Sequence, residues 1–167
     1  MERDEFIKYG IIKFGDFILT SGQKSTYYVD IKEACTDPII LGKIIDGLSP
    51  MVIYGQISGM ELGSVPLLVG LSLKLNIRYA IVRKSEREHG TGKRIVGTVE
   101  KNSKIDIIED VVTTGNSILK TADILRKNGA IVDHAICVVD REAGGTELLK
   151  ENGIALASMA KISELMK

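Results

Sequence analysis

The sequence has few of the residues that build disulfide or metal sites, and it has no excess of either charge. It contains two cysteines, Cys35 and Cys137, and two histidines. The cysteines lie far apart without a C-x-x-C pair, which argues against a disulfide framework and a structural zinc site. Both are expected to be buried as small apolar side chains. Lys plus Arg and Asp plus Glu number 22 each, so the overall charge pattern of a nucleic-acid or membrane binder is absent.

Long apolar runs are also missing. The longest uncharged stretch, residues 47–60, is 14 residues long and includes Pro50, and another, residues 62–73, is 12 residues long and includes Pro66, whereas a membrane-spanning helix needs about 20 apolar residues. The chain starts Met-Glu-Arg-Asp-Glu, which places charges where a signal peptide has its apolar region. These features predict a cytoplasmic protein. At about 150 residues per domain, residues 1–167 are expected to form a single domain.

Short apolar runs alternate with helical patterns, which predicts an α/β fold with a mostly parallel sheet flanked by helices. A helix is expected over residues 117–128, ending before Gly129, and another is expected to begin where Asp37 precedes Pro38. Residues 85–97 carry charges of both signs and three glycines, which is typical of a long mobile loop or a hairpin. Strands are expected at residues 51–54, 79–82, 105–109 and 131–139.

Asp106 is unusual inside such a strand, because central parallel strands are normally buried on both faces. It is expected to lie at the exposed beginning of the strand.

The most informative segment joins the strand near residue 109 to the next helix. Two acids end the strand, and small hydroxyl residues around a glycine then open the helix. Free backbone N–H groups at a helix start, with Thr and Ser hydroxyls, can bind a phosphate without a lysine. The acids would repel that phosphate, so they suit ribose hydroxyls, or Mg²⁺ through water. The residues are Glu109, Asp110, Val111, Val112, Thr113, Thr114, Gly115, Asn116 and Ser117.

This arrangement predicts a site for a 5-phosphorylated sugar. The alternative is that Glu109 and Asp110 only cap the helix while Thr113 and Thr114 form a turn. The sequence has no G-x-x-x-x-G-K-[ST] motif and no G-x-G-x-x-G motif between a strand and a helix. P-loop and dinucleotide-binding sites are therefore excluded.

Residues 109–117 resemble the phosphoribosyl-pyrophosphate signature of the type I phosphoribosyltransferases. Three further stretches are similar to segments of the orotate phosphoribosyltransferases, and together the four cover nearly the whole chain in the family's order. The first is the Ser-Gly-x-x-Ser-x-Tyr pattern within residues 17–28. The others are Arg83-Lys84 followed by Arg87, His89-Gly90 and Gly92, and Asp140-Arg141-Glu142 with Gly144-Gly145.

The resemblance implies an enzyme with the type I phosphoribosyltransferase fold and a small N-terminal hood segment. It would transfer the phosphoribosyl group of 5-phosphoribosyl 1-pyrophosphate to orotate, giving orotidine 5′-monophosphate and pyrophosphate in pyrimidine biosynthesis. Mg²⁺ is the implied cofactor. It would be bound by the substrate and by water molecules near Asp110, without direct protein ligands. The implied assembly is a homodimer with a shared active site, and neither nucleic acid nor membrane is an expected partner.

In the family, positions matching Arg83, Lys84, Arg87 and His89 hold pyrophosphate. Lys84, Arg87 and His89 are the expected catalytic residues, because negative charge grows on the leaving group. The glycines of this segment would let it close as a lid. Residues 58–63 match the family's pyrophosphate loop and are expected to follow a strand and open a helix.

For orotate, Arg141 offers paired donors to a carboxylate, and Lys24 and Thr113 lie at family positions near the base. Tyr27 and Tyr28 alternate along a strand, so at most one of them faces the site.

The chain also departs from the family pattern. Arg87 stands where the family most often has a catalytic lysine, and Thr20 replaces another lysine of many members. Arginine keeps the charge but cannot donate its proton to the leaving group. Two other functions stay open: transfer to another base, which would leave Arg141 without a carboxylate to bind, and a non-catalytic sensor of phosphoribosyl pyrophosphate.

Overall fold

The computed structural model describes residues 1–18, 24–85 and 94–167. Its main sheet has the strand order β5-β4-β3-β6-β7-β8, and all neighbours are parallel except β4 and β5. The strands are β3 (Gln56–Met60), β4 (Arg78–Val82), β5 (Ile95–Val96), β6 (Lys104–Val112), β7 (Ile131–Asp140) and β8 (Ala155–Lys161). The expected α/β fold with a mostly parallel sheet flanked by helices is confirmed.

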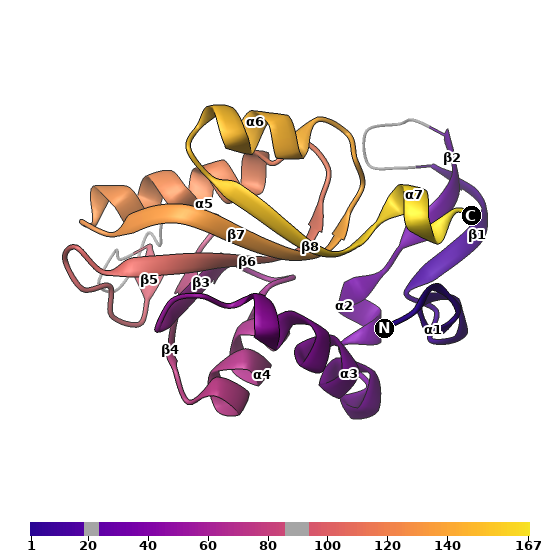
Figure 1. Ribbon diagram of the computed structural model, residues 1–167, viewed down its shortest axis with the longest axis horizontal. Helices are drawn as coiled ribbons and strands as arrows, with labels where there is room; N and C mark the ends of the chain where they lie inside the picture. Colours follow the sequence, from indigo (N-terminus) through magenta and orange to yellow (C-terminus); the bar gives the residue numbers. More distant parts are fainter. Residues whose placement is uncertain (19–23, 86–93) are drawn as a thin grey trace.

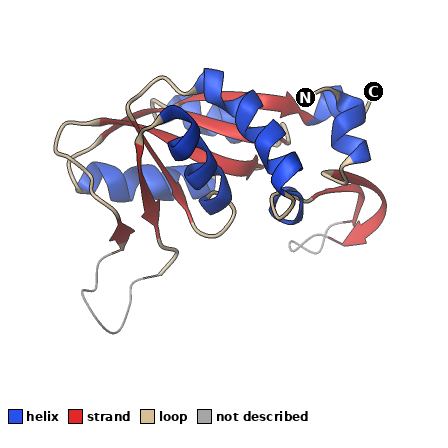
Figure 2. Cartoon of the chain, turned by 90° about the horizontal axis from the view of Figure 1, so that it is seen from below, coloured by secondary structure: helices blue, strands red, loops and turns tan. Residues whose placement is uncertain are grey.

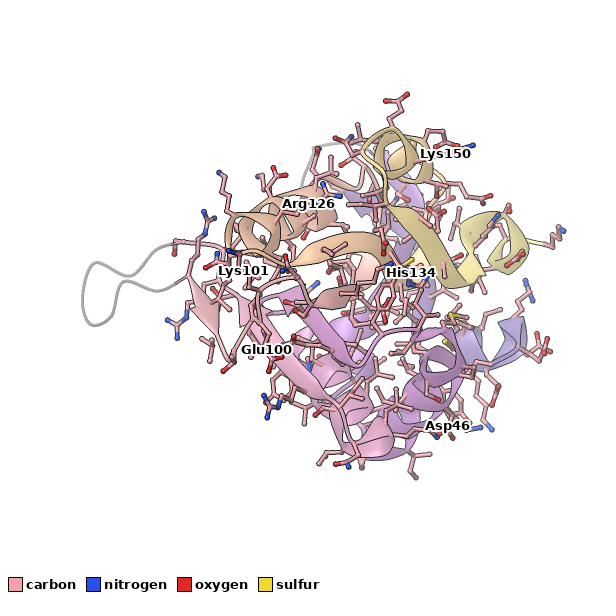
Figure 3. The ribbon with its side chains drawn as sticks, turned by 60° about the vertical axis from the view of Figure 1, so that its left-hand side comes forward. Asp46, Glu100, Lys101, Arg126, His134 and Lys150 are labelled. Carbon is pink, nitrogen blue, oxygen red and sulfur yellow. The ribbon has the colours of Figure 1, made fainter. Side chains whose placement is uncertain are left out.

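Helices cover both faces of this sheet (Figure 1). On one face lie α3 (Pro38–Leu48) and α4 (Val65–Leu75), which Figure 2 shows from below, and on the other lie α5 (Asn116–Lys127) and α6 (Gly145–Glu151). Two apolar clusters correspond to the two faces. One contains Ile44 and Leu67, and the other contains Leu125 and Leu149, all fully buried. In Figure 3, Asp46 on α3 and Lys150 on α6 mark the opposite sides.

A small N-terminal unit forms the expected hood. The strands β1 (Ile12–Ile18) and β2 (Lys24–Val29) pair antiparallel, between α1 (Arg3–Lys8) and the short α2 (Ile31–Ala34). The C-terminal helix α7 (Ile162–Leu165) lies beside α1, and Arg3 Nε donates to the Leu165 carbonyl at 3.1 Å. The two chain ends therefore meet in the hood (Figure 1).

Helix starts agree with the local sequence. Asp37 caps α3 by accepting from the backbone N–H groups of Ile39 (2.8 Å) and Ile40 (3.1 Å), with Pro38 in the first turn. The α5 helix begins at Asn116, one residue before the predicted position, and follows Gly115 with φ 77°. Both cysteines are buried, as expected.

The environment of Asp106 corrects two predictions. Asp106 is fully buried rather than exposed at the beginning of β6. Its Oδ2 accepts from the backbone N–H groups of Ile53 (3.0 Å) and Tyr54 (2.8 Å), and its Oδ1 lies 2.7 Å from His134 Nδ1. Because these two N–H groups bind a carboxylate instead of a neighbouring strand, residues 51–54 are not the predicted strand.

The strand that was predicted at residues 51–54 begins later in the chain, as β3. A 3₁₀ helix, η1 (Ser49–Met51), precedes it, and β3 begins only at Gln56. Residues 58–60 therefore belong to β3, and the turn into α4 is confined to residues 61–64. The strands predicted at 79–82, 105–109 and 131–139 are present with longer bounds.

Within the described ranges, no helix combines the length and the apolar composition needed to cross a membrane.

Candidate active site

The candidate site lies where β3 and β6 are neighbours in the sheet. From β3 the chain proceeds through α4 to β4 on one side, and from β6 through α5 to β7 on the other. Such a reversal leaves a crevice at the carboxyl ends of the two strands, where open α/β sheets bind ligands. The acidic pair and the predicted phosphate segment both lie at this end of β6.

The segment after the acidic pair forms a cradle at the start of α5. Residues 109 and 111–118 line a cavity of about 200 Å³. The first hydrogen bond of the helix runs from the Leu119 N–H to the Gly115 carbonyl (3.0 Å). The N–H groups of Asn116, Ser117 and Ile118 therefore lie before the first backbone hydrogen bond of the helix. Donors in this position, at the positive end of the helix dipole, suit an anion.

Gly145 explains why the Gly144-Gly145 pair accompanies this cradle. It is buried, and a Cβ atom on it would lie 2.8 Å from the Thr113 carbonyl and 3.1 Å from the Gly115 nitrogen. A glycine at this point lets α6 pack directly against the backbone that forms the cradle.

The acidic pair is buried at the end of β6, with 6% of each residue exposed. Burial, with the adjacent Asp110 carboxylate, raises the pKa of Glu109 to about 8. Burial opposes ionisation of Asp110 as well, but its contacts with Glu109 and Lys32 outweigh that effect and lower its pKa. Within the buried pair, ionisation of Asp110 is therefore favoured over ionisation of Glu109.

The two oxygens of Asp110 have different partners. Oδ1 accepts from the Val111 N–H at 2.9 Å, whereas Oδ2 has no hydrogen-bond donor among the described residues. Oδ2 makes an ion pair with Lys32 Nζ at 2.7 Å, outside hydrogen-bond geometry. A Cβ atom at Gly63 would overlap this carboxylate, so glycine is needed where the turn after β3 passes Asp110.

The stretch that begins with Arg83 and Lys84, here called the cationic segment, starts near the edge of the sheet. The Arg83 N–H donates to the Arg94 carbonyl (2.9 Å), and Arg94 Nη2 donates to the Lys84 carbonyl (2.9 Å). These bonds and the antiparallel β4–β5 pair join the two described ends of the segment that was predicted to be a mobile loop or a hairpin. Arg87 and His89 lie outside the described residues.

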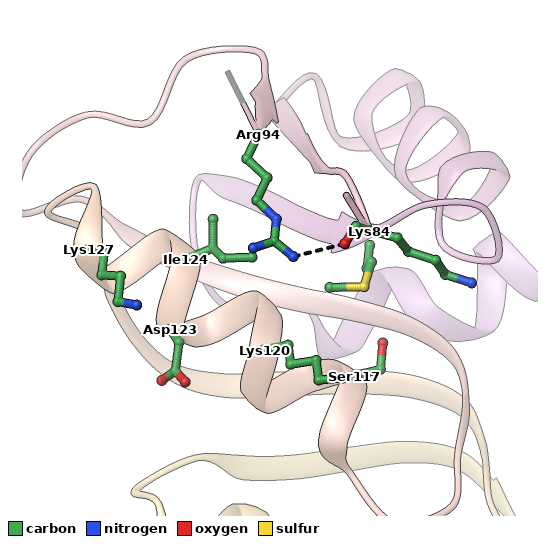
Figure 4. A pocket seen from close by; sticks show the side chains of 8 residues that line it. Lys84, Arg94, Ser117, Lys120, Asp123, Ile124 and Lys127 are labelled. Atoms are coloured by element: carbon green, nitrogen blue, oxygen red, sulfur yellow. Dashed lines mark hydrogen bonds between the residues drawn. The ribbon is translucent and has the colours of Figure 1, made fainter. Parts of the chain in front are cut away.

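A second cleft, of about 590 Å³, connects this segment to the cradle. Figure 4 shows Lys84 and Arg94 on one side and Ser117, Lys120 and Lys127 projecting from α5 on the other. The structure thus brings Lys84 and Ser117, far apart in the sequence, to one cleft. Lys120 was not predicted, although its position one helical turn after Ser117 places it on the same face.

Arg141 lies at the end of β7, directly beside the cradle. Its N–H donates to the Val112 carbonyl (2.8 Å), and the side chain of Asp140 fixes the turn by accepting from the Glu142 N–H (2.8 Å) and from Thr146 Oγ1 (2.8 Å). The loop geometry therefore holds the arginine where β6 ends.

The hood reaches Arg141 through Tyr27. Arg141 Nε and Nη2 donate to the Tyr27 hydroxyl at 3.3 and 3.2 Å, and the guanidinium lies 5.1 Å from the ring centroid. Tyr28 instead packs on Phe17, with ring centroids 5.7 Å apart. The two tyrosines face opposite sides, as expected.

Lys24 and Lys32 complete the hood's contribution. Lys24 is exposed and shares the strand face of Tyr28, so the structure does not bring it together with Arg141, and its role with orotate stays a prediction. Lys32 contacts the site but was not predicted, because no local pattern in residues 30–35 indicates a partner on β6.

Comparison with known proteins agrees with this geometry. Residues 56–152 match the model of the phosphoribosyl transferase domain. The orotate phosphoribosyltransferase of Thermoplasma acidophilum is 58% identical over 97% of this chain and 94% of the relative. That of Pyrococcus horikoshii is 45% identical over 96% of this chain and 89% of the relative.

Solved structures show the same fold. The crystal structure of orotate phosphoribosyltransferase from Aeropyrum pernix superposes with a TM-score of 0.89 at 31% identity, covering 99% of this chain and 96% of that one. The adenine phosphoribosyltransferase of Thermoanaerobacter pseudethanolicus has a TM-score of 0.73 at 21% identity, covering 94% and 98%, which shows that the fold alone does not select the base. The two relatives are 58% and 45% identical to this chain over nearly its full length, which shows that the chain belongs to the orotate phosphoribosyltransferase family.

Proposed function

We propose that this chain transfers the phosphoribosyl group of 5-phosphoribosyl 1-pyrophosphate to N1 of orotate, giving orotidine 5′-monophosphate and pyrophosphate. The observation that carries this proposal is the order of groups at the end of β6. An acceptor carboxylate on Asp110 is followed at once by the phosphate cradle, and Arg141 is anchored to Val112 between them. A sugar phosphate and an anionic base would find complementary groups within one crevice.

In this assignment the 5-phosphate binds residues 113–117, whose backbone and hydroxyl groups donate to it. Ribose hydroxyls donate to Asp110, and Glu109, whose ionisation is disfavoured by burial and by the adjacent Asp110, supports the pair without adding a full second negative charge. Val111 and Val112 contribute backbone to the cradle. The sugar is thereby held with C1 toward the β3 turn and the cationic segment.

Departure of pyrophosphate develops negative charge on the leaving group, so cations placed around it lower the barrier. Arg83 and Lys84 are proposed for this role from the described part of the segment, and Arg87 and His89 are proposed from the family resemblance. Lys84 is the catalytic candidate that shares a cleft with the cradle.

For the base, Arg141 is proposed to bind the orotate carboxylate through its paired donors. In the structure, the Nε and Nη2 groups of Arg141 both donate to the Tyr27 hydroxyl. This edge of the guanidinium is therefore already directed at an oxygen acceptor. Thr113 and Lys24 are proposed to contact the base from the cradle and the hood.

Mg²⁺ is proposed to enter with the pyrophosphate. Among the described residues, no group of three His, Cys, Asp or Glu side chains could hold a metal ion by itself. The Asp110 carboxylate nevertheless is a hard oxygen donor that suits hydrated Mg²⁺. When bound with the substrate, the ion would offset charge on the leaving group.

A homodimer in the cytoplasm is proposed as the working form. Leu62, Val69 and Leu73 follow one another at helical spacing on and just before α4, and they are 67%, 38% and 80% exposed. An apolar stripe of this kind suits a second copy of the chain. The two free, buried cysteines fit a reducing compartment.

The experiment that tests this function presents four bases separately. Protein, phosphoribosyl pyrophosphate and Mg²⁺ are mixed with orotate, uracil, hypoxanthine or adenine, and the loss of each base is followed. We expect consumption of orotate alone. Turnover of another base with orotate untouched would assign a different base specificity, and binding of phosphoribosyl pyrophosphate without any turnover would indicate a sensor.

A further inference from the structure

The side chain of Lys32, in the hood, makes an ion pair with the acidic pair. Its Nζ lies 2.7 Å from Asp110 Oδ2, the oxygen that has no hydrogen-bond donor among the described residues. The two residues come from distant parts of the chain, α2 and β6. This ion pair therefore joins the hood to the oxygen proposed to receive the ribose hydroxyls.

The backbone around Lys32 is fixed without the help of its side chain. Ile31 and Ala34 are 1% and 6% exposed and belong to the apolar core. Asp30 accepts from the Glu33 N–H at 3.3 Å and caps the α2 turn. The Lys32 side chain itself is 60% exposed, so its removal leaves these anchors intact.

The pair also fits the charges of the site. Burial opposes the charge on Lys32, yet attraction by Asp110 and Glu109 more than offsets it, and its pKa is raised. An ammonium therefore stands beside the buried carboxylate at neutral pH. Without this cation, Asp110 would lie beside Glu109 with no opposite charge in contact among the described residues.

We infer that Lys32 is a positioning residue for phosphoribosyl transfer, whose ammonium holds the Asp110 carboxylate in the orientation that accepts the ribose hydroxyls. Lys32 acts through Asp110 and need not touch the substrate. The inference rests on the proposed function, because it gives Asp110 the role of ribose acceptor.

Lys32→Met removes the ammonium and keeps an unbranched apolar side chain. We expect kcat/KM for phosphoribosyl pyrophosphate to fall about two- to fivefold, the size expected for a partly exposed ion pair, with little change in the KM for orotate. Lys32→Arg, which keeps the charge, should recover most of the loss. The melting temperature of the free protein should stay close to that of the wild type.

The matched control is Lys74→Met. Lys74 is also a half-exposed lysine in an ion pair, with Asp46 of α3, outside the site (Figure 3), and its replacement should leave both constants unchanged. A double-mutant cycle then distinguishes positioning from an independent role. Lys32→Met in an Asp110→Asn background should cost no further activity, because the residue it positions is already altered.

Three results would overturn the inference: unchanged kinetics in Lys32→Met, no recovery in Lys32→Arg, or losses that simply multiply in the double variant. Failure of the proposed function can be told apart from failure of this inference, because in the former case the wild-type protein itself would not consume orotate.

Discussion

Mixing two inactive variants, Arg87→Ala and Asp110→Ala, should restore about one quarter of wild-type activity. The family resemblance implies that the segment carrying Arg87 serves the active site of the neighbouring subunit. Each variant alone should be nearly inactive, the first through lost stabilisation of the leaving group and the second through lost ribose or metal contacts. In a heterodimer one site would carry both lesions and the other neither.

The expected recovery follows from symmetry. Random exchange makes about half of the dimers heterodimers, each with one intact site of two. Native mass spectrometry can confirm that the chains have exchanged. Exchanged chains without recovered activity would show that the segment serves its own subunit. The described ends of this segment lie beside the edge strand β5.

Asp110→Asn should reduce turnover or substrate binding by about 1.5–3 kcal/mol, or about tenfold to a hundredfold in rate. The substitution keeps the shape of the side chain but removes the charge that makes Oδ2 a strong acceptor for ribose hydroxyls. Steady-state kinetics and thermal melting of the free protein measure the two effects separately.

Melting should change little, because Lys32 is largely exposed and water can solvate it when its partner is neutral. If activity is unaffected while the fold is destabilised, Glu109 and Asp110 only cap the helix after β6.

The parts of the fold that local sequence determines were predictable. The start of α5 and the cap of α3 depend on residues within a few positions of each other, such as Gly115 before Asn116 and Asp37 before Pro38. The order of strands and helices likewise follows from apolar periodicity, which reflects burial along each element.

What could not be predicted depends on contacts between distant residues. Asp106 is buried because the backbone of Ile53 and Tyr54 folds back to donate to it, and the same contact ends the strand expected there. Lys32 reaches Asp110 only because the hood packs over the end of β6. Neither pairing leaves a local spacing pattern in the sequence, so only the tertiary structure shows it.

A crystal structure of the protein with orotidine 5′-monophosphate would test the proposed site most directly. We expect the phosphate to accept from the backbone N–H groups of residues 113–117, the ribose hydroxyls to donate to Asp110, and the base carboxylate to pair with Arg141. A nucleotide bound with its phosphate outside this cradle, or with its carboxylate away from Arg141, would contradict the assignment.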